Sequence, residues 1–127
     1  MADFLEYIIM EIVDKKITKS ELVRKFLNYF ETVSKAVVDI EKEIIAIDAE
    51  LHSDLEAYLL ENGSEQENLW GINFYPFKNK TDFIEYTALI NIRPHQDNRS
   101  MEVENPEIKE KIKKIVDKLI EYELSLS

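Results

Sequence analysis

The 127-residue sequence predicts a single α+β domain, and three observations support this class. A chain of this length is enough for one ordinary domain and too short for two. Hydrophobic residues follow helical spacing at both ends of the chain and alternate with period two between residues 69 and 93. The composition, with 45% hydrophobic residues, is enough to bury a core.

The first 33 residues predict a helical hairpin. Apolar residues at helical spacing indicate one helix over residues 3–16, and a short turn separates it from a second helix that begins after Thr18. Thr18 and Glu21 have the spacing of a capping box, in which each side chain satisfies a backbone N–H of the first turn. The apolar face of this second helix consists of Leu22, Val23, Phe26, Leu27, Phe30 and Val33.

Residues 34–51 allow two interpretations. Their apolar residues recur in steps of three and four, which is typical of a long helix that would run from residue 19 to 61. The same segment is rich in β-branched residues, which favours a β-hairpin with strands over residues 36–40 and 44–50. The turn of that hairpin, Glu41 to Glu43, lacks the Gly or Asn that tight turns favour. The hydrophobic pattern alone does not decide between the two.

The remaining segments are clearer. A short helix that Ser53 or Asp54 caps ends at Asn62 and Gly63, because glycine suits the left-handed residue that closes a helix. Two strands follow, over residues 70–75 and 84–92, and each ends at a proline. In the second strand, the residues expected to face the helices are Ile84, Tyr86, Ala88, Ile90 and Ile92.

The C-terminal part predicts a short edge strand at residues 101–103 and a final helix. Asn105 and Pro106 form a strong helix start, since Asn caps the first turn and Pro is preorganised at the first helical position. The buried face of this helix is expected to consist of Ile108, Ile112, Ile115, Val116 and Leu119.

Composition excludes several classes of function. The absence of Cys excludes disulfide scaffolds and thiolate chemistry, and no apolar run approaches the ~20 residues of a membrane span. The two glycines form no phosphate-binding loop. The net charge is −10, and residues 35–68 alone, with two basic and ten acidic side chains, contribute −8. We therefore expect no nucleic acid partner, no membrane partner and no cofactor, with a cation or a basic partner as the alternative to a merely solvated acidic face.

Several blocks of the sequence resemble a family of small prokaryotic proteins of unknown function. These blocks read VVDIE, ELHSD, GS, LWGINFYP, INIRP and NRS, and the resemblance extends from residue 35 to about residue 120. The family form has Gly where this chain has Glu43, and Gly-Gly at Asp48 and Ala49. Glycines there imply turns and a bulged strand end, so the resemblance implies that residues 35–50 form a β-hairpin.

With that hairpin, the expected architecture is complete. One domain, residues 1–127, divides into the helical hairpin of residues 1–33, a sheet region over residues 35–104 and a C-terminal helix over residues 106–124. The sheet has four mainly antiparallel strands, and the helices pack on one of its faces.

Two clusters could carry chemistry. The first is Glu50, His52, Asp54 and Glu56, whose imidazole and carboxylate groups suit a transition metal, with His52 and Asp54 as the metal ligands. The second is the loop that holds Arg93, Gln96, Asn98 and Arg99, where two guanidinium groups and neighbouring amides suit an anion. The structural alternative is that the arginines pair with the acids of residues 50–56 and hold the loop in place.

These observations favour a cytoplasmic, non-enzymatic interaction module. Leu22, Phe26, Tyr29 and Phe30 give the second helix more apolar surface than one packing face uses, which predicts a homo-oligomer, most simply a homodimer. The alternative is a small-ligand or metal-binding protein, or an enzyme, whose site combines residues 50–56 with residues 93–100. The sequence identifies no ligand and leaves enzymatic activity undecided.

Overall fold

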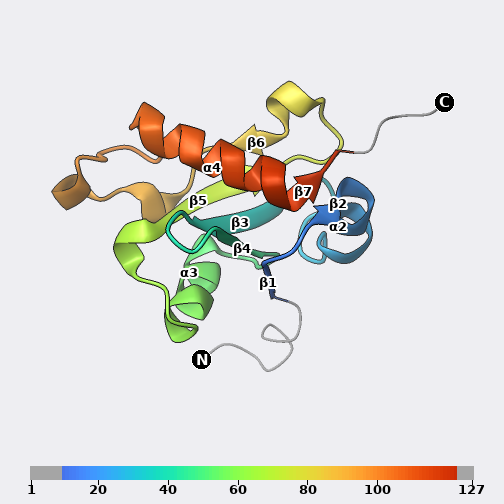
Figure 1. The fold of residues 1–127 in the computed structure, drawn as a ribbon, viewed down its shortest axis with the longest axis horizontal. Helices are drawn as coiled ribbons and strands as arrows, with labels where there is room; N and C mark the ends of the chain where they lie inside the picture. Colours follow the sequence, from blue (N-terminus) through green and yellow to red (C-terminus); the bar gives the residue numbers. More distant parts are fainter. Residues whose placement is uncertain (1–9, 123–127) are drawn as a thin grey trace.

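A computed structural model describes residues 10–122, and within it helices cover both faces of an antiparallel sheet (Figure 1). The main sheet has the strand order β1-β4-β3-β5-β6, and β2 pairs with β7 in a separate two-stranded parallel unit. The strands are β1 (Glu11–Val13), β2 (Ile17–Thr18), β3 (Ser34–Asp39), β4 (Ile44–Ile47), β5 (Leu69–Phe74), β6 (Ile84–Glu85) and β7 (Ile120–Glu121). The helices are α2 (Lys19–Lys25), α3 (His52–Glu61) and α4 (Pro106–Leu119), with short 3₁₀ turns η1 (Gln66–Asn68), η2 (Lys80–Asp82), η3 (Leu89–Asn91) and η4 (Pro94–Gln96).

The sheet separates two hydrophobic clusters. Alternate residues of β3 point to opposite faces, so Val38 packs under α4 and Val37 packs against α3. The larger cluster, on the α4 side, also contains Leu22 of α2, and the smaller one holds Leu55 and Leu59 of α3. The α+β class is confirmed, but the antiparallel sheet has five strands instead of the expected four, because residues 11–13 add a strand beside β4. The expectation that the helices share one face is wrong, because β3, β4 and β5 are buried on both faces and need two covers.

The N-terminal helical hairpin is also wrong where the structure describes it. Part of the expected first helix, residues 3–9, lies outside the described residues, and Glu11–Val13 form β1, antiparallel to β4. The second helix starts as predicted, since Thr18 Oγ1 accepts a hydrogen bond from the Glu21 N–H at 3.1 Å. It ends at Lys25 rather than near Val33. Pairing of β-branched residues with β4 outweighs helical spacing at β1.

The predicted hairpin of residues 35–50 is confirmed as β3 and β4. Asp39, almost fully buried, makes the turn possible without glycine, because its carboxylate accepts the N–H groups of Glu41 and Lys42, each at 2.9 Å. The resemblance had implied glycines at Glu43 and at Asp48. Both residues adopt left-handed backbone angles, with φ of 57° and 72°.

The period-two strand expected over residues 84–92 is only partly correct. Alternation holds from Ile84 to Thr87, but ladder pairing stops at Glu85, and residues 89–91 form a 3₁₀ turn. Ile92 is 43% exposed instead of covered by a helix. The expected edge strand at residues 101–103 reduces to one bridge, between Glu102 and Thr87.

The side chain of Asn91 explains this departure. It is fully buried and bonds to both backbone groups of Gly71, accepting from the N–H at 2.8 Å and donating to the carbonyl at 3.0 Å. The Asn91 amide thus replaces the strand that β5 would otherwise need at this edge. Gly71 is required here, because a Cβ at this position would lie 2.4 Å from the Cβ of Ala88.

The C-terminal helix begins at Pro106 as predicted but ends at Leu119 instead of residue 124, because Ile120 and Glu121 form β7. Asn105 caps α4 through hydrogen bonds from the N–H groups of Glu107 and Ile108, and Asn62 and Gly63 end α3 as expected. The predicted cap of α3 is wrong, since Leu51 occupies that position and supplies no side-chain acceptor.

We expect Asn91→Ala to lower the free energy of unfolding by about 3 kcal/mol, because it leaves two buried backbone groups of Gly71 unpaired. Urea denaturation would measure the change. Asn62→Ala is the matched control, since the Asn62 amide makes an exposed bond to the Tyr58 carbonyl and its loss should cost under about 1 kcal/mol. Equal effects of the two substitutions would contradict the role given to Asn91.

The two left-handed residues should respond in opposite ways to glycine. Glu43→Gly should raise the free energy of unfolding by about 0.5–1 kcal/mol, because it removes strain and loses only an exposed ion pair with Lys118. Asp48→Gly should lower it, because the Asp48 carboxylate accepts both the N–H and the side-chain amide of Asn28. Thermal or urea unfolding of the pair tests this, and stabilisation by both substitutions would be inconsistent with it.

Candidate functional site

A pocket of about 460 Å³ lies on the α3 side of the sheet, between the start of α3 and the segment that follows β6. Three polar residues cross its floor in register, since Lys35 of β3 pairs with Asn73 of β5, which pairs with Glu85 of β6. Paired residues of neighbouring strands point to the same face, with strands ~4.8 Å apart. The floor is therefore cationic at one end and anionic at the other. Its apolar lining consists of Leu51, Ala88, Leu89, Ile90 and Met101.

Hydrogen bonds fix the anionic end of this row. The Asn73 amide donates to Glu85 Oε1 at 2.8 Å and to the Thr87 carbonyl at 3.1 Å, and the Tyr75 hydroxyl donates to Glu85 Oε1 at 3.0 Å. The amide nitrogen of Asn73 is thus fully used. The Asn73 side chain also hydrogen-bonds to His52, so among residues 10–122 Glu85 Oε2 is the oxygen of this row that remains able to accept a hydrogen bond from a ligand.

The cationic end is held from the opposite side. Lys35 Nζ donates to the Glu50 carbonyl at 2.8 Å and lies 5.0 Å from the centre of the Phe30 ring. These contacts use part of the donor capacity of an ammonium group, which has three N–H bonds. The first turn of α3 begins beside it, and no side chain caps the N–H groups of that turn. Ser53 of this turn also lines the pocket.

His52 stands over the floor with a defined orientation. Its Nε2 lies 2.9 Å from the carbonyl oxygen of Ile72, and because a carbonyl only accepts, Nε2 carries the proton. The Cδ2 atom faces Gly71, so the edge of the ring with Nε2 and Cδ2 is turned to β5 and the edge with Nδ1 is turned away from it. Burial lowers the pKa of His52, and the charge of Lys35 adds to this effect. The imidazole is therefore a neutral acceptor in the pocket.

The arginine loop is placed differently from its prediction. Arg93 is buried and donates to the backbone carbonyls of Gln66 and Leu69 and to the side chain of Gln96, and its guanidinium carbon lies 4.1 Å from the centre of the Trp70 ring. Burial lowers its pKa, against the opposing charge of Glu56. Arg93 thus closes the start of β5, and it is buried with the donors of both Nη1 and Nη2 turned to its own chain.

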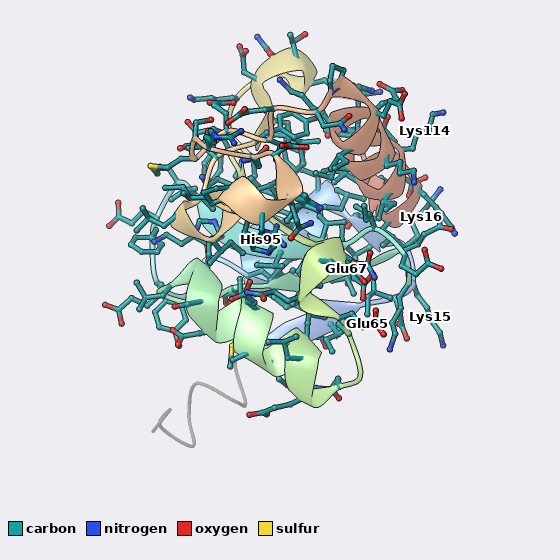
Figure 2. The ribbon with its side chains drawn as sticks, turned by 90° about the vertical axis from the view of Figure 1, so that its left-hand side faces the viewer. Lys15, Lys16, Glu65, Glu67, His95 and Lys114 are labelled. Carbon is teal, nitrogen blue, oxygen red and sulfur yellow. The ribbon has the colours of Figure 1, made fainter. Side chains whose placement is uncertain are left out.

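Asn98 and Gln96 also stabilise the loop itself. The buried amide of Asn98 donates to the carbonyls of Asn91, Ser100 and Glu102, and Gln96 Nε2 donates to the Glu67 carbonyl at 3.1 Å. Figure 2 shows this side of the molecule and labels His95 of η4 and the nearby Glu67, whose carbonyl accepts the hydrogen bond from Gln96.

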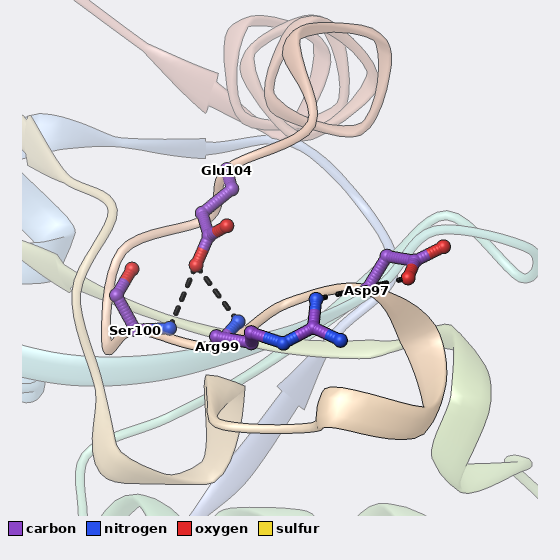
Figure 3. Close-up of polar contacts among 4 residues, drawn as sticks. All are labelled: Asp97, Arg99, Ser100 and Glu104. Carbon is purple, nitrogen blue, oxygen red and sulfur yellow. Dashed lines mark hydrogen bonds and ion pairs between the residues drawn. The ribbon is translucent and has the colours of Figure 1, made fainter.

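The backbone donors of the same loop bind an acid from their own chain. Glu104 accepts hydrogen bonds from the N–H groups of Arg99 and Ser100 at 2.8 and 2.7 Å (Figure 3). The bonds from Ser100 and Arg99 lower the pKa of this carboxyl. The Arg99 guanidinium is exposed and lies 3.9 Å from Asp97. Glu104 thus occupies the backbone donors of this loop, while the Arg99 guanidinium stays exposed.

The eight predicted residues do not form one site. His52 lines the pocket together with Lys35, Asn73 and Glu85, which the sequence reasoning missed. In residues 10–122 no ion pair joins the acids of residues 50–56 to either arginine, although the charge of Glu56 acts on Arg93. The same residues contain no group of three or more His, Asp or Glu side chains arranged to hold a metal. The proposed ligands His52 and Asp54 therefore lack a third partner there.

The sequence contains one signal that points to this pocket. Asn73 is the polar residue within the strand sequence LWGINF, and a polar side chain in a strand that is buried on both faces calls for partners or a function.

Comparison with known proteins identifies a family and no function. A family model described as a protein of unknown function (DUF5674) matches residues 11–119. No curated protein and no solved structure matches the chain. Among the described residues, no helix is both long and apolar enough to cross a membrane.

We expect the imidazole of His52 to titrate with a midpoint below its usual 6.5 and to keep its proton on Nε2 at neutral pH. Nitrogen-15 NMR of the two histidines, with His95→Gln for assignment, would measure both properties. Because the folded-state pKa is depressed, His52 stabilises the fold above pH 6.5, and this contribution is lost as pH falls through the lower folded-state value. A midpoint above 6.5 would contradict the buried, neutral histidine.

Proposed function

Because the chain belongs to the DUF5674 family, whose function is unknown, we propose a function from the geometry of the pocket. The protein is a binding protein for a small zwitterionic ligand that carries an apolar side chain, such as an amino acid. The observation that carries the proposal is the row of Lys35, Asn73 and Glu85 on the pocket floor. A pocket of about 460 Å³ is within the usual range for small-molecule sites.

The two ends of the row suit the two charges of the ligand head. An ammonium group needs acceptors, and Glu85 Oε2 and the neutral imidazole of His52 supply them. A carboxylate needs donors, which Lys35 and the uncapped first turn of α3 supply. Since one charge of each sign lies on the floor, a zwitterion is favoured over a simple cation or anion.

The apolar rim supports the second half of the proposal. Leu89 is 70% exposed, Leu51 53% and Met101 40%, and all three line the pocket. Large apolar side chains that are exposed around a polar floor are typical of a ligand-binding surface, because a bound ligand buries them. No nucleophile is held beside His52 by a hydrogen bond within residues 10–122, so binding is favoured over catalysis.

The same rim favours a second candidate function, a self-associating interaction module. The original reason for expecting it, surplus apolar surface on the second helix, is weakened because Leu22 and Phe26 are both buried in the core. The exposed rim takes its place as the surface that a second copy would cover. Light scattering distinguishes the candidates, since self-association through the rim requires a dimer that Leu89→Ser dissociates.

The binding proposal is tested with three matched probes of similar apolar size. L-Leucine carries both charges, 3-methylbutylamine only the positive one and 4-methylpentanoate only the negative one. In NMR titrations of the ¹⁵N-labelled protein we expect leucine to shift the amide signals of Gly71, Asn73 and Leu89. Its dissociation constant should be at least about tenfold lower than that of either singly charged probe.

Substitutions then assign the two charges. Glu85→Gln keeps the acceptor for Asn73 but removes the charge, and Lys35→Gln removes the cation; each should weaken leucine binding about tenfold. Glu65→Gln and Lys111→Gln make the same chemical changes on exposed residues outside the pocket and should have no effect. Equal binding of the three probes, or no shift at about 50 mM leucine, would overturn the proposal.

A further inference from the structure

A second pocket lies on the opposite side of β6. Strand alternation divides this segment between the two faces of the sheet, so Glu85 and Thr87 line the pocket described above, while Ile84 and Tyr86 face α4. The second pocket has a volume of about 310 Å³ and is bounded by η2, β6, α4 and Tyr122. Its polar lining is of a different kind, because hydroxyl and ammonium donors predominate.

Two tyrosines supply donors that the described fold does not use. The rings of Tyr86 and Tyr122 pack against the larger hydrophobic cluster, and the Tyr122 ring meets Phe83 edge to face at 5.0 Å between ring centres. Packing therefore fixes both rings. Among the described residues, neither phenol group makes a hydrogen bond, although both tyrosines line the pocket. Burial raises the pKa of each phenol, so both remain protonated donors at neutral pH.

Lysine side chains lie over the rings of both tyrosines. Lys80 Nζ lies 4.9 Å from the centre of the Tyr122 ring, and Lys109 Nζ lies 4.8 Å from that of Tyr86. Lys113 also lines the pocket and is held by Asp117 at 2.8 Å. Among the charged side chains that line the pocket, Lys80 and Lys113 are positive and Asp117 is negative, so the lining carries a net charge of +1. This is the reverse of the whole chain, whose net charge is −10.

We infer that this pocket is an oxyanion site for a tetrahedral group, a phosphoryl or sulfuryl group. The hydroxyl groups of Tyr86, Tyr122 and Thr81 donate to its oxygens, and the ammonium groups of Lys80 and Lys113 balance its charge. Donors that come from η2, β6, α4 and the segment after α4 approach from several directions, which suits a tetrahedral anion better than a planar carboxylate. The site is independent of the zwitterion pocket, since the sheet lies between them.

The test is an NMR titration of the full chain with inorganic phosphate, sulfate and acetate, each compared with sodium chloride at the same ionic strength. We expect saturable shifts of the amide signals of Thr81, Tyr86 and Tyr122 with phosphate or sulfate, at millimolar dissociation constants, and about tenfold weaker binding of acetate. Stronger binding of phosphate would identify a phosphoryl ligand, and stronger binding of sulfate a sulfuryl ligand.

Two sets of variants separate a site from general charge screening. The double variant Tyr86→Phe with Tyr122→Phe keeps both rings and removes the hydroxyls, and Lys80→Gln removes one cation; each should weaken phosphate binding about tenfold. Lys111→Gln, an exposed lysine of α4 outside the pocket, is the control and should bind as the wild type does. Should the double variant fail to fold, Lys80→Gln against Lys111→Gln decides the question alone.

Three results would overturn the inference: no saturation by about 50 mM phosphate, equal binding of acetate, or an equal loss of affinity in Lys80→Gln and Lys111→Gln.

Discussion

The fold depends on the way in which side chains finish the outer edge of β5. The strand β6 pairs with only the last part of β5, so the backbone groups nearer its start have no strand beside them. Asn91 bonds to both groups of Gly71, and Arg93 donates to the Leu69 carbonyl. An edge of this kind would otherwise leave buried polar groups unpaired, at a cost of about 1–3 kcal/mol each. The side chains of Asn91 and Arg93 therefore supply hydrogen bonds that the backbone of a longer β6 would otherwise supply.

This solution also makes the pocket. Because the Asn91 amide replaces the ladder, the chain between Ala88 and Asn91 is free to turn, and it brings Leu89 and Ile90 to the pocket wall. A regular strand through residues 84–92 would have placed these side chains in the ladder and closed the space. Gly71 completes the arrangement, since it allows Ala88 and His52 to approach β5 closely. The edge that stabilises the sheet and the wall that shapes the site are the same structure.

Sequence patterns predicted the elements whose cause is local. The Asn105 cap of α4, the end of α3 at Gly63 and the strand over residues 69–74 depend on neighbours in the chain, and all three are found. The β-hairpin of residues 35–50 followed from the resemblance to a family and not from periodicity. Heptad-like spacing in this segment favoured a helix, whereas its many β-branched residues favoured strands. Patterns failed where a residue distant in the sequence determines the secondary structure. The strand β1 is an example, because its partner β4 lies more than 30 residues later.

The candidate site shows the same limit. The sequence singled out His52, and it lies in the pocket, but its neighbours Lys35 and Glu85 come from strands whose register one sequence does not reveal. Arg93 and Asn98 were read as ligand-binding groups because their side chains suit anions. In the fold the same donors satisfy backbone carbonyls. Residue type predicts what a side chain can bind, and the tertiary structure decides whether that capacity is already used.

The strand β6 and the residue that follows it line two pockets on opposite faces of the sheet. Glu85 faces the pocket that contains both a positive and a negative charge. Its two neighbours in the chain, Ile84 and Tyr86, face the pocket that is rich in hydrogen-bond donors. Because the strand has only two ladder residues, each pocket depends on the same short backbone. A substitution that disturbs the backbone of β6 is therefore expected to alter both pockets, whereas a substitution of one side chain alters the pocket on its own face of the sheet.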